Sequence, residues 1–261
     1  MATWAPMINN RPLTDQWAVV TGGSKGIGQG IAARLLVGGA NLVLVARGSE
    51  ELQSAVEEAR AVTADGQVVF GLIADVSHRD SIDTLFSEIR NRLPFLNIFV
   101  ANAGTGSVTP FLELTRSEWD DIVALNLTGT MYSVQHAARM MTENTQTNSA
   151  ILAVSSIRAL GARPGRLVYA ATKAALNQSV RVAATELAHA GIRVNALSPG
   201  ITETPLTAAN PGPFREAVGS VPMGRAAQPS DLGEAAYFLC SPGSRFITGI
   251  NLVVDGGESL H

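Results

Sequence analysis

The sequence contains a single cysteine, Cys240, among its 261 residues. One cysteine excludes an intrachain disulfide and fits a protein of a reducing compartment. Cys240 lies in an apolar run, AAYFLC, which favours a small core residue over a nucleophile. The histidines, at positions 78, 136, 189 and 261, have no spacing typical of metal ligands, so we expect no metal site.

Long runs of one residue type are also missing. No basic run stands out and the formal net charge is -3 at pH 7, which argues against a nucleic-acid-binding protein. No apolar stretch approaches the length of a membrane span. Residues 1–16 lack the basic-then-apolar order of a signal peptide, and we interpret residues 1–14 as a short tail. We therefore expect a cytoplasmic protein with neither nucleic-acid nor membrane partners.

Short β-branched runs alternate along the chain with longer segments of helical spacing. The predicted strands are 17–22, 41–47, 68–76, 96–104, 150–156, 192–200 and 250–257. The predicted helices are 26–40, 49–66, 81–93, 117–141, 168–191 and 231–241, and the proline-rich stretch 201–229 is expected to be irregular.

The strand sequences indicate how the elements pack. NLVLV, LNIFV and AILAV are continuously apolar, as in strands buried on both faces of a parallel sheet. With 46% hydrophobic residues, the chain can bury a full core. We predict an α/β fold: a single-domain, doubly wound parallel sheet (Rossmann-like) over residues 15–261, with helices on both faces. Ligands of such folds bind beyond the carboxyl ends of the strands.

A glycine-rich turn, TGGSKGIG (21–28), joins the first strand to the first helix. Gly22 permits a tight turn, while Gly26 and Gly28 let the backbone approach a pyrophosphate. The helix N-terminus would offer free N–H groups and a positive dipole end to the phosphates. The glycine spacing differs from G-x-G-x-x-G, and a plain tight turn is the alternative interpretation.

The second strand ends in VAR (45–47), where an NAD enzyme would carry an acid for the ribose hydroxyls. Here Ala46 is followed by Arg47, and Lys25 lies in the glycine turn. Two cations without an acid suit a 2′-phosphate, so we expect NADP(H) rather than NAD(H). Solvated surface charges are the alternative.

Two further strand ends carry small or acidic residues. Asp75 closes the third strand and could accept a hydrogen bond from the adenine amino group or cap the next helix. The NAG motif (102–104) leaves room for the nicotinamide ring and its ribose, or is another tight turn.

These motifs resemble those of the short-chain dehydrogenase/reductase family. The matching pieces, in family order, are TGGSKGIG (21–28), DV (75–76), NAG (102–104), Asn126, SS (155–156), YAATK (169–173), SPG (198–200) and ITGINLVVDGG (247–257). They extend over nearly the whole chain after the tail, and the ordered set is far more specific than any one motif. One departure is Ala101, where many members have an asparagine before NAG; Asn102 remains.

The resemblance implies hydride transfer between NADP(H) and a ketone or secondary alcohol. It assigns a catalytic tetrad of Asn126, Ser156, Tyr169 and Lys173. Tyr169 and Lys173 are four residues apart and share a helix face, so we expect the ammonium, together with the positive charge of the oxidised nicotinamide, to lower the phenol pKa from about 10 and make a general acid–base. Ser156 would hydrogen-bond the substrate oxygen, and Asn126 would hold a water that links Lys173 to solvent. A solvated helix pair is the alternative for YAATK considered alone.

The resemblance also implies the coenzyme contacts. In the loop after the sixth strand, family precedent places the Thr202 backbone and the Thr204 side chain at the carboxamide. The expected contacts are Gly22, Ser24, Lys25, Gly26, Ile27, Gly28, Arg47, Asp75, Val76, Asn102, Ala103, Gly104, Tyr169, Lys173, Pro199, Gly200, Thr202 and Thr204.

The substrate is less well defined by the sequence. Arg158 could reach a substrate carboxylate or phosphate, or be a surface arginine in a loop that also carries Arg163 and Arg166. The chain resembles 3-oxoacyl-(acyl-carrier-protein) reductases and carbonyl reductases, although segment 142–149 is poor in the basic residues that would hold an acidic carrier.

Three alternatives to the NADP(H)-dependent reductase stay open. They are a 3-oxoacyl-(acyl-carrier-protein) reductase, an NAD-dependent alcohol dehydrogenase and a non-catalytic dinucleotide-binding regulator or scaffold. The resemblance implies a homotetramer or dimer, with faces of helices 117–141 and 168–191 at the interface.

Overall fold

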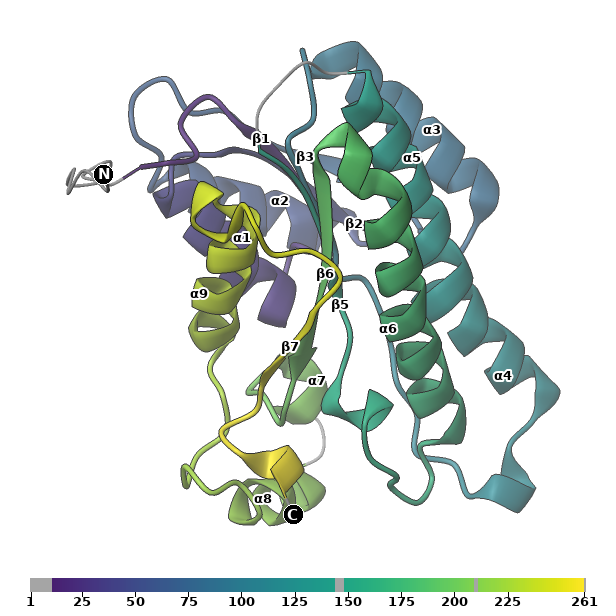
Figure 1. Ribbon diagram of the computed structural model, residues 1–261. Coiled ribbons are helices and arrows are strands. Elements are labelled where there is room, and N and C mark those ends of the chain that lie inside the picture. The colour runs from purple at the N-terminus through teal and green to yellow at the C-terminus, as the bar shows by residue number, and fades with distance from the viewer. Residues whose placement is uncertain (1–10, 144–147, 209–210, 261) are drawn as a thin grey trace, which may run out of the picture.

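A computed structural model describes residues 11–143, 148–208 and 211–260 (Figure 1). The start of the predicted tail and the middle of segment 142–149 lie outside the described residues. Seven strands form one parallel sheet in the order β3-β2-β1-β4-β5-β6-β7. They are β1 (Trp17–Thr21), β2 (Asn41–Ala46), β3 (Val69–Ile73), β4 (Ile98–Ala101), β5 (Ser149–Val154), β6 (Ile192–Pro199) and β7 (Asn251–Val254). The predicted fold class is confirmed.

The central strands are buried on both faces, as their unbroken apolar runs predict. Every residue of β4, β5 and β6 is buried, whereas the edge strand β7 is half-buried along its length. Because both sides of the sheet exclude water, residues along one strand contribute to two separate cores.

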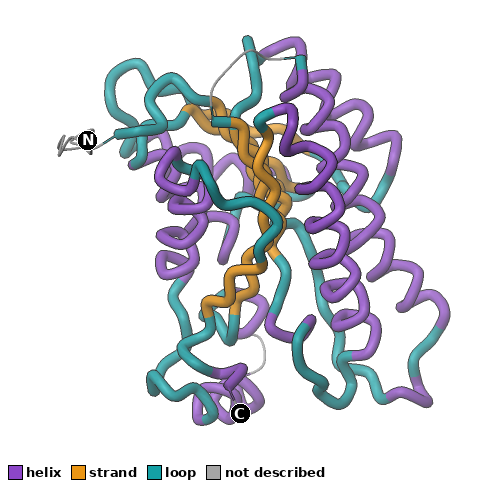
Figure 2. The backbone as a smooth tube through the Cα atoms, in the orientation of Figure 1, coloured by secondary structure: helices purple, strands orange, loops and turns teal. Residues whose placement is uncertain are grey.

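Helices cover both faces of this sheet (Figures 1 and 2). The helices α1 (Gly26–Val37), α2 (Ser49–Arg60) and α9 (Pro229–Cys240) pack in one core. The helices α3 (Arg79–Arg92), α5 (Thr130–Thr142) and α6 (Leu167–Leu187) pack in the other. The chain leaves β1 toward β2 and later returns to β4 on the other side of β1, so the topological switch point lies between β1 and β4.

The predicted helix 117–141 is one helical path with a widened turn inside it. It consists of α4 (Arg116–Val123), a π-helical turn over Ala124–Gly129, and α5. Gly129 explains the widening, because a Cβ atom at this position would lie 1.7 Å from the Val76 carbonyl oxygen. Only a glycine allows the backbone to approach so closely, and π turns of this kind often occur at functional sites.

Most predicted elements differ from the structure in their exact bounds, and two of these differences are described here. The prediction that residues 201–229 are irregular is wrong, because α7 (Pro205–Ala208) and α8 (Pro211–Gly219) form there and each begins at a proline. Proline favours the first position of a helix, where its missing N–H costs no hydrogen bond. The predicted helix 49–66 ends earlier, at Arg60.

The packed unit includes the end of the predicted tail. Leu13 is fully buried, and its N–H donates to the Gly38 carbonyl oxygen over 3.0 Å. The assignment of a tail stays a prediction for residues 1–10. In the described part of the chain, no helix combines the length and apolarity needed to cross a membrane.

Candidate functional site

A cavity of about 760 Å³ lies at the carboxyl ends of the strands, where the fold predicts a ligand site. Residues that follow β1, β2, β3, β4, β5 and β6 line it. It contains every predicted coenzyme contact, together with Ser156, Tyr169 and Lys173. Asn126 is fully buried behind the lining residues. The sheet therefore brings together side chains that are far apart in the sequence.

The glycine turn has the geometry that a pyrophosphate site needs. Gly22 and Gly26 have φ values of 62° and 57°, which other residues rarely adopt. A Cβ atom on Gly28 would lie 2.1 Å from the Gly22 carbonyl oxygen, so α1 can pack this closely only with glycine there. The first turn of α1 has no acidic residue and no side-chain cap, so its N–H groups are available to an anion.

At the expected ribose site, the predicted cations are paired with acids. The Lys25 ammonium lies 2.8 Å from a Glu51 carboxylate oxygen, and Arg47 Nη1 lies 3.5 Å from Asp75 Oδ2. Glu51 comes from the first turn of α2 and lines the cavity. The expectation that no acid lies near the ribose is therefore wrong. The signal that could have found Glu51 is its place one helical turn after the VAR strand end.

Asp75 lines the cavity and is held by its own loop. Its Oδ1 accepts hydrogen bonds from the Ser77 N–H over 2.9 Å and from the Ser77 hydroxyl over 2.6 Å. Burial raises the pKa of Asp75, but the Ser77 hydrogen bonds and the Arg47 charge outweigh it and hold the pKa below the usual range. Helix α3 has no side-chain cap, so Asp75 is a cavity residue and not a helix cap.

Ser156 and Tyr169 meet at the other end of the cavity. Ser156 follows β5, and Tyr169 lies in the first turn of α6. Burial raises the pKa of Tyr169, while the hydrogen bond with Ser156 and the charges of Arg166 and Arg158 act in the opposite direction without cancelling it. For the chain without coenzyme, burial prevails, and the expected lowering by Lys173 together with the bound coenzyme stays a prediction.

Lys173 is buried and its ammonium is directed to the backbone. Its Nζ donates to the Val154 carbonyl oxygen over 2.8 Å and lies 5.8 Å from the centre of the Tyr169 ring. Burial lowers the pKa of Lys173 to about 8. The side chain therefore stays largely protonated at neutral pH and keeps a positive charge near the phenol.

Asn126 lies in the π turn and contacts the loop after β4. A Cβ atom on Gly104 would lie 3.2 Å from Asn126 Oδ1 and 3.6 Å from Lys173 Nζ, so Gly104 separates these two side chains. The structure thus brings Asn126 and Lys173 to the same glycine. The role of Asn126 in holding a water stays a prediction.

The loop after β6 is organised by a residue that the sequence analysis missed. Thr207 donates through its hydroxyl to the Thr202 carbonyl oxygen over 2.8 Å, and its Oγ1 accepts from the Thr204 N–H over 2.9 Å. Thr204 also contacts the glycine turn, because a Cβ atom on Gly26 would lie 3.2 Å from its methyl group. The loop after β6 and the glycine turn are therefore in direct contact.

At the substrate end, Arg158 is paired with an acid from the far end of the chain. Its guanidinium contacts Glu258, whose side chain is 4% exposed. Glu258 Oε2 also accepts a hydrogen bond from the Ile201 N–H over 2.8 Å. Arg163 and Arg166 line the same part of the cavity. In residues 11–143, 148–208 and 211–260, no cluster of His, Cys, Asp and Glu could hold a metal ion.

Comparisons with known proteins agree with this geometry. A family model described as enoyl-(acyl carrier protein) reductase matches residues 22–259. A solved short-chain type dehydrogenase/reductase from Mycobacterium marinum is 29% identical, with a TM-score of 0.90 over 95% of this chain and 97% of that one. The chain belongs to the short-chain dehydrogenase/reductase family.

Two characterised members of this family are similar over most of their length. A 3-oxoacyl-[acyl-carrier-protein] reductase of Staphylococcus aureus is 34% identical over 92% of this chain and 96% of that protein. A cis-4-hydroxycyclohexanecarboxylate dehydrogenase of Sinomonas cyclohexanicum is 36% identical over 92% of this chain and 95% of that protein. This short-chain dehydrogenase/reductase is therefore an oxidoreductase of alcohol or ketone groups, in a family that uses a nicotinamide dinucleotide.

The residues present fit such a coenzyme. In this short-chain dehydrogenase/reductase, one continuous cavity joins the open N-terminus of α1 to Tyr169 and Ser156. The backbone has no side chain at three positions of the expected phosphate end, Gly22, Gly26 and Gly28. It also has none at Gly104, beside Lys173. A dinucleotide extends over both ends when it binds across the switch point of such a sheet.

Proposed function

We propose that the chain is an NADP(H)-dependent reductase that transfers hydride between the coenzyme and a ketone or secondary alcohol, with Tyr169 as general acid–base. The observation that supports this most is that Ser156 and Tyr169 both line the cavity that begins at the glycine turn. A substrate oxygen bound beside both hydroxyls would lie within reach of a proton donor.

The proposed roles of the residues follow from their surroundings. The bound coenzyme supplies or accepts the hydride. The Tyr169 hydroxyl donates a proton to the carbonyl oxygen, and the Ser156 hydroxyl orients that oxygen. Because burial raises the pKa of Tyr169, the phenol is protonated at neutral pH, which is the form that reduction needs. Lys173 keeps a positive charge nearby to stabilise the phenolate left after transfer.

The coenzyme preference is proposed from Lys25 and Arg47, which line the ribose end of the cavity. A 2′-phosphate would replace Glu51 as the partner of Lys25. The contact between Lys25 and Glu51 is exposed, and exposed ion pairs contribute little free energy. Glu51 is the one observation that favours the NAD(H) alternative, because its carboxylate could accept from the ribose hydroxyls. Fluorescence titration with NADPH and NADH distinguishes the two, and tighter binding of NADH would overturn the NADP(H) proposal.

The substrate is proposed to be a small ketone or its alcohol. The relatives' names suggest two candidates for this chain: a 3-oxoacyl thioester and 4-oxocyclohexanecarboxylate. Consumption of NADPH with both compounds, and with the methyl ester of the second, tests the reaction directly. NADPH binding without turnover of any ketone would favour the scaffold alternative.

A Tyr169→Phe variant tests the chemistry. Phenylalanine keeps the ring but removes the proton donor, so kcat should fall by about 10² to 10⁴. The dissociation constant for NADPH should stay within about threefold, a change of less than 1 kcal/mol. Tyr132→Phe, on α5 outside the cavity, is the matched control. Retained turnover in Tyr169→Phe would contradict the mechanism.

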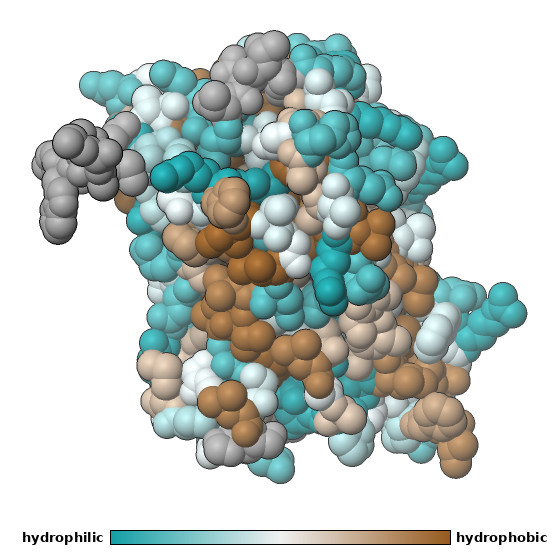
Figure 3. Space-filling model, viewed as in Figure 1, coloured by the Kyte–Doolittle hydropathy of each residue, from teal (hydrophilic) through white to brown (hydrophobic). Residues whose placement is uncertain are grey.

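We also propose a cytoplasmic homo-oligomer, a tetramer or dimer. Figure 3 shows an apolar band on the face that carries the half-buried strand β7. The exposed apolar residues near this strand include Phe246, Phe238 and Ile250. Apolar surface of this kind is typical of contacts between subunits. Light scattering of the purified protein tests the proposal, and a monomer would contradict it.

A further inference from the structure

The charges that line the cavity are not balanced at its substrate end. Three cations have carboxylate partners, in the pairs Lys25–Glu51, Arg47–Asp75 and Arg158–Glu258. Within the described part of the chain, Arg163 and Arg166 have no carboxylate oxygen within 4.0 Å of their guanidinium nitrogens. The substrate end therefore carries uncompensated positive charge, while the ribose end is neutralised by its own acids.

Arg166 lies beside the phenol. It immediately precedes α6, three residues before Tyr169, and is half-buried. A Cβ atom on Gly106 would lie 3.3 Å from Arg166 Nη1 and 3.3 Å from Tyr169 Cδ2, so the guanidinium and the phenol ring both border Gly106. The Arg166 guanidinium is therefore near the place where the proposed substrate oxygen binds.

The guanidinium is also fixed in place. Arg166 Nη1 donates to the Ser107 carbonyl oxygen over 2.9 Å. This bond uses one of the five N–H donors of the side chain and leaves the others for a ligand. Burial lowers the pKa of Arg166, and the neighbouring charges of Arg163 and Arg158 add to that effect. A desolvated cation without a counter-ion is costly, and a bound anion would offset this cost.

We propose that Arg166, assisted by Arg163, binds a carboxylate of the substrate, so that the chain acts on oxo acids and the corresponding hydroxy acids. This inference rests on the proposed function. A guanidinium presents parallel N–H donors that match the two oxygens of a carboxylate. Because Gly106 has no side chain, the carboxylate can lie along the wall between Arg166 and the phenol.

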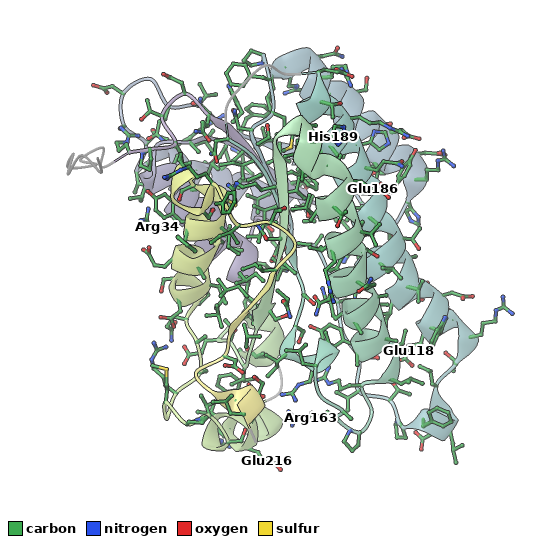
Figure 4. The ribbon with its side chains drawn as sticks, viewed as in Figure 1. Arg34, Glu118, Arg163, Glu186, His189 and Glu216 are labelled. Carbon is green, nitrogen blue, oxygen red and sulfur yellow. The ribbon has the colours of Figure 1, made fainter. Side chains whose placement is uncertain are left out.

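The other arginines have different roles. Arg158, which the sequence analysis left open as either a contact for a substrate anion or a surface arginine, is neutralised by Glu258, so we do not assign the anion site to it. Arg163 is exposed, and Figure 4 shows it at the end of the molecule where the strands have their carboxyl ends. An exposed cation at the cavity mouth raises the local concentration of anionic ligands, which is a contribution to capture rather than to orientation.

Binding to the NADPH-loaded protein tests the site without requiring turnover. The probes are cyclohexanecarboxylate, which has no ketone, and the uncharged cyclohexanecarboxamide, both measured by calorimetry. Arg166→Gln should weaken binding of the carboxylate by about 10- to 100-fold, as expected for a lost charge-assisted hydrogen bond, and leave the amide within about threefold. Arg166→Lys keeps the positive charge but loses the paired N–H donors. Its affinity for the carboxylate should therefore lie between the affinities of the unmodified protein and of Arg166→Gln. Arg245→Gln, an exposed arginine outside the cavity, is the matched control.

Turnover provides the second readout. For 4-oxocyclohexanecarboxylate, Arg166→Gln should raise KM by about the same 10- to 100-fold while kcat changes by less than about threefold. The ratio of kcat/KM for this keto acid to kcat/KM for its methyl ester should therefore fall by about 10- to 100-fold in Arg166→Gln. If Arg166→Gln unfolds, Arg166→Lys carries the same comparison.

The other possible results of these measurements would overturn either the carboxylate site or the proposed function. Equal binding of the carboxylate and the amide to the unmodified protein, or equal weakening of both by Arg166→Gln, would overturn the carboxylate site. Failure to turn over any ketone despite NADPH binding would instead overturn the proposed function. In that case the calorimetric comparison still decides whether Arg166 binds a carboxylate.

Discussion

Asn126 and Thr105 form a two-point contact between the π turn and the loop after β4. The Thr105 N–H donates to Asn126 Oδ1 over 2.9 Å, and Asn126 Nδ2 donates to the Thr105 carbonyl oxygen over 2.7 Å. The fully buried Asn126 carboxamide thus serves as the hydrogen-bond partner of both Thr105 backbone groups. It fixes the loop after β4, which lines the cavity.

Replacing this amide should destabilise the protein. Asn126→Ala leaves both Thr105 backbone groups without their partner, and we expect the free energy of unfolding to fall by about 2 kcal/mol. Urea denaturation measures this change. Ser133→Ala is the control, because it removes only a bond from a hydroxyl to the carbonyl of its own helix, at Gly129. Equal losses in the two variants would contradict a special role for the Asn126 contact.

Lys173 should make stability depend on pH above neutrality. Burial lowers its pKa from 10.5 to about 8, so between these values the unfolded chain binds more protons than the folded chain. Stability rises with pH in such a window. Relative to Lys173→Met, the free energy of unfolding should therefore increase by about 3 kcal/mol as pH rises through it. Urea titrations from neutral pH to about pH 10 measure the difference, and a constant difference would rule out the buried ammonium as its cause.

Glu51 should weaken NADPH binding by occupying Lys25. Glu51→Gln removes the carboxylate, frees the ammonium and lowers the negative potential near a 2′-phosphate. We expect NADPH to bind several-fold more tightly, by up to about 1 kcal/mol, because the lost contact is exposed. Arg47→Gln is the opposite control and should weaken NADPH more than NADH. If Glu51→Gln weakens binding of both coenzymes, Glu51 binds the ribose itself.

The pair of Arg158 and Glu258 should matter more for stability than the exposed pairs. Arg158→Met leaves a carboxylate that is only 4% exposed without its cation, which we expect to cost about 3 kcal/mol. The double variant Arg158→Met, Glu258→Gln should recover part of this loss, because no uncompensated charge remains. Lys25→Met, which breaks a pair more than half exposed, should cost less than about 1 kcal/mol. Thermal and urea denaturation of these variants provide the comparison.

The sheet and the position of the site could be predicted because they depend on local patterns. NLVLV and LNIFV are apolar on both sides, which is possible only for strands covered by helices on two faces. Ser156, Tyr169 and Lys173 follow from motifs, and the sheet topology brings them together. These predictions needed no knowledge of side-chain positions.

The partners of the charged residues could not be predicted, because they depend on tertiary contacts. Glu258 reaches Arg158 across 100 residues of sequence, and no local pattern encodes that approach. The π turn follows from the close approach of Gly129 to Val76, which lie on different elements. The burial of Tyr169 could not be predicted for a related reason: the spacing of Tyr169 and Lys173 is local, but the burial that raises the phenol pKa is a property of the whole fold.

Glu258 also affects when the cavity can reach its final form during synthesis. Its carboxylate bridges the loop after β5, through Arg158, and the loop after β6, through Ile201, yet it follows β7 in the chain. While a nascent chain lacks β7, those two loops have no common partner. Until Glu258 has been synthesised, the substrate end therefore lacks the carboxylate that connects these two loops, even though the glycine turn emerges first.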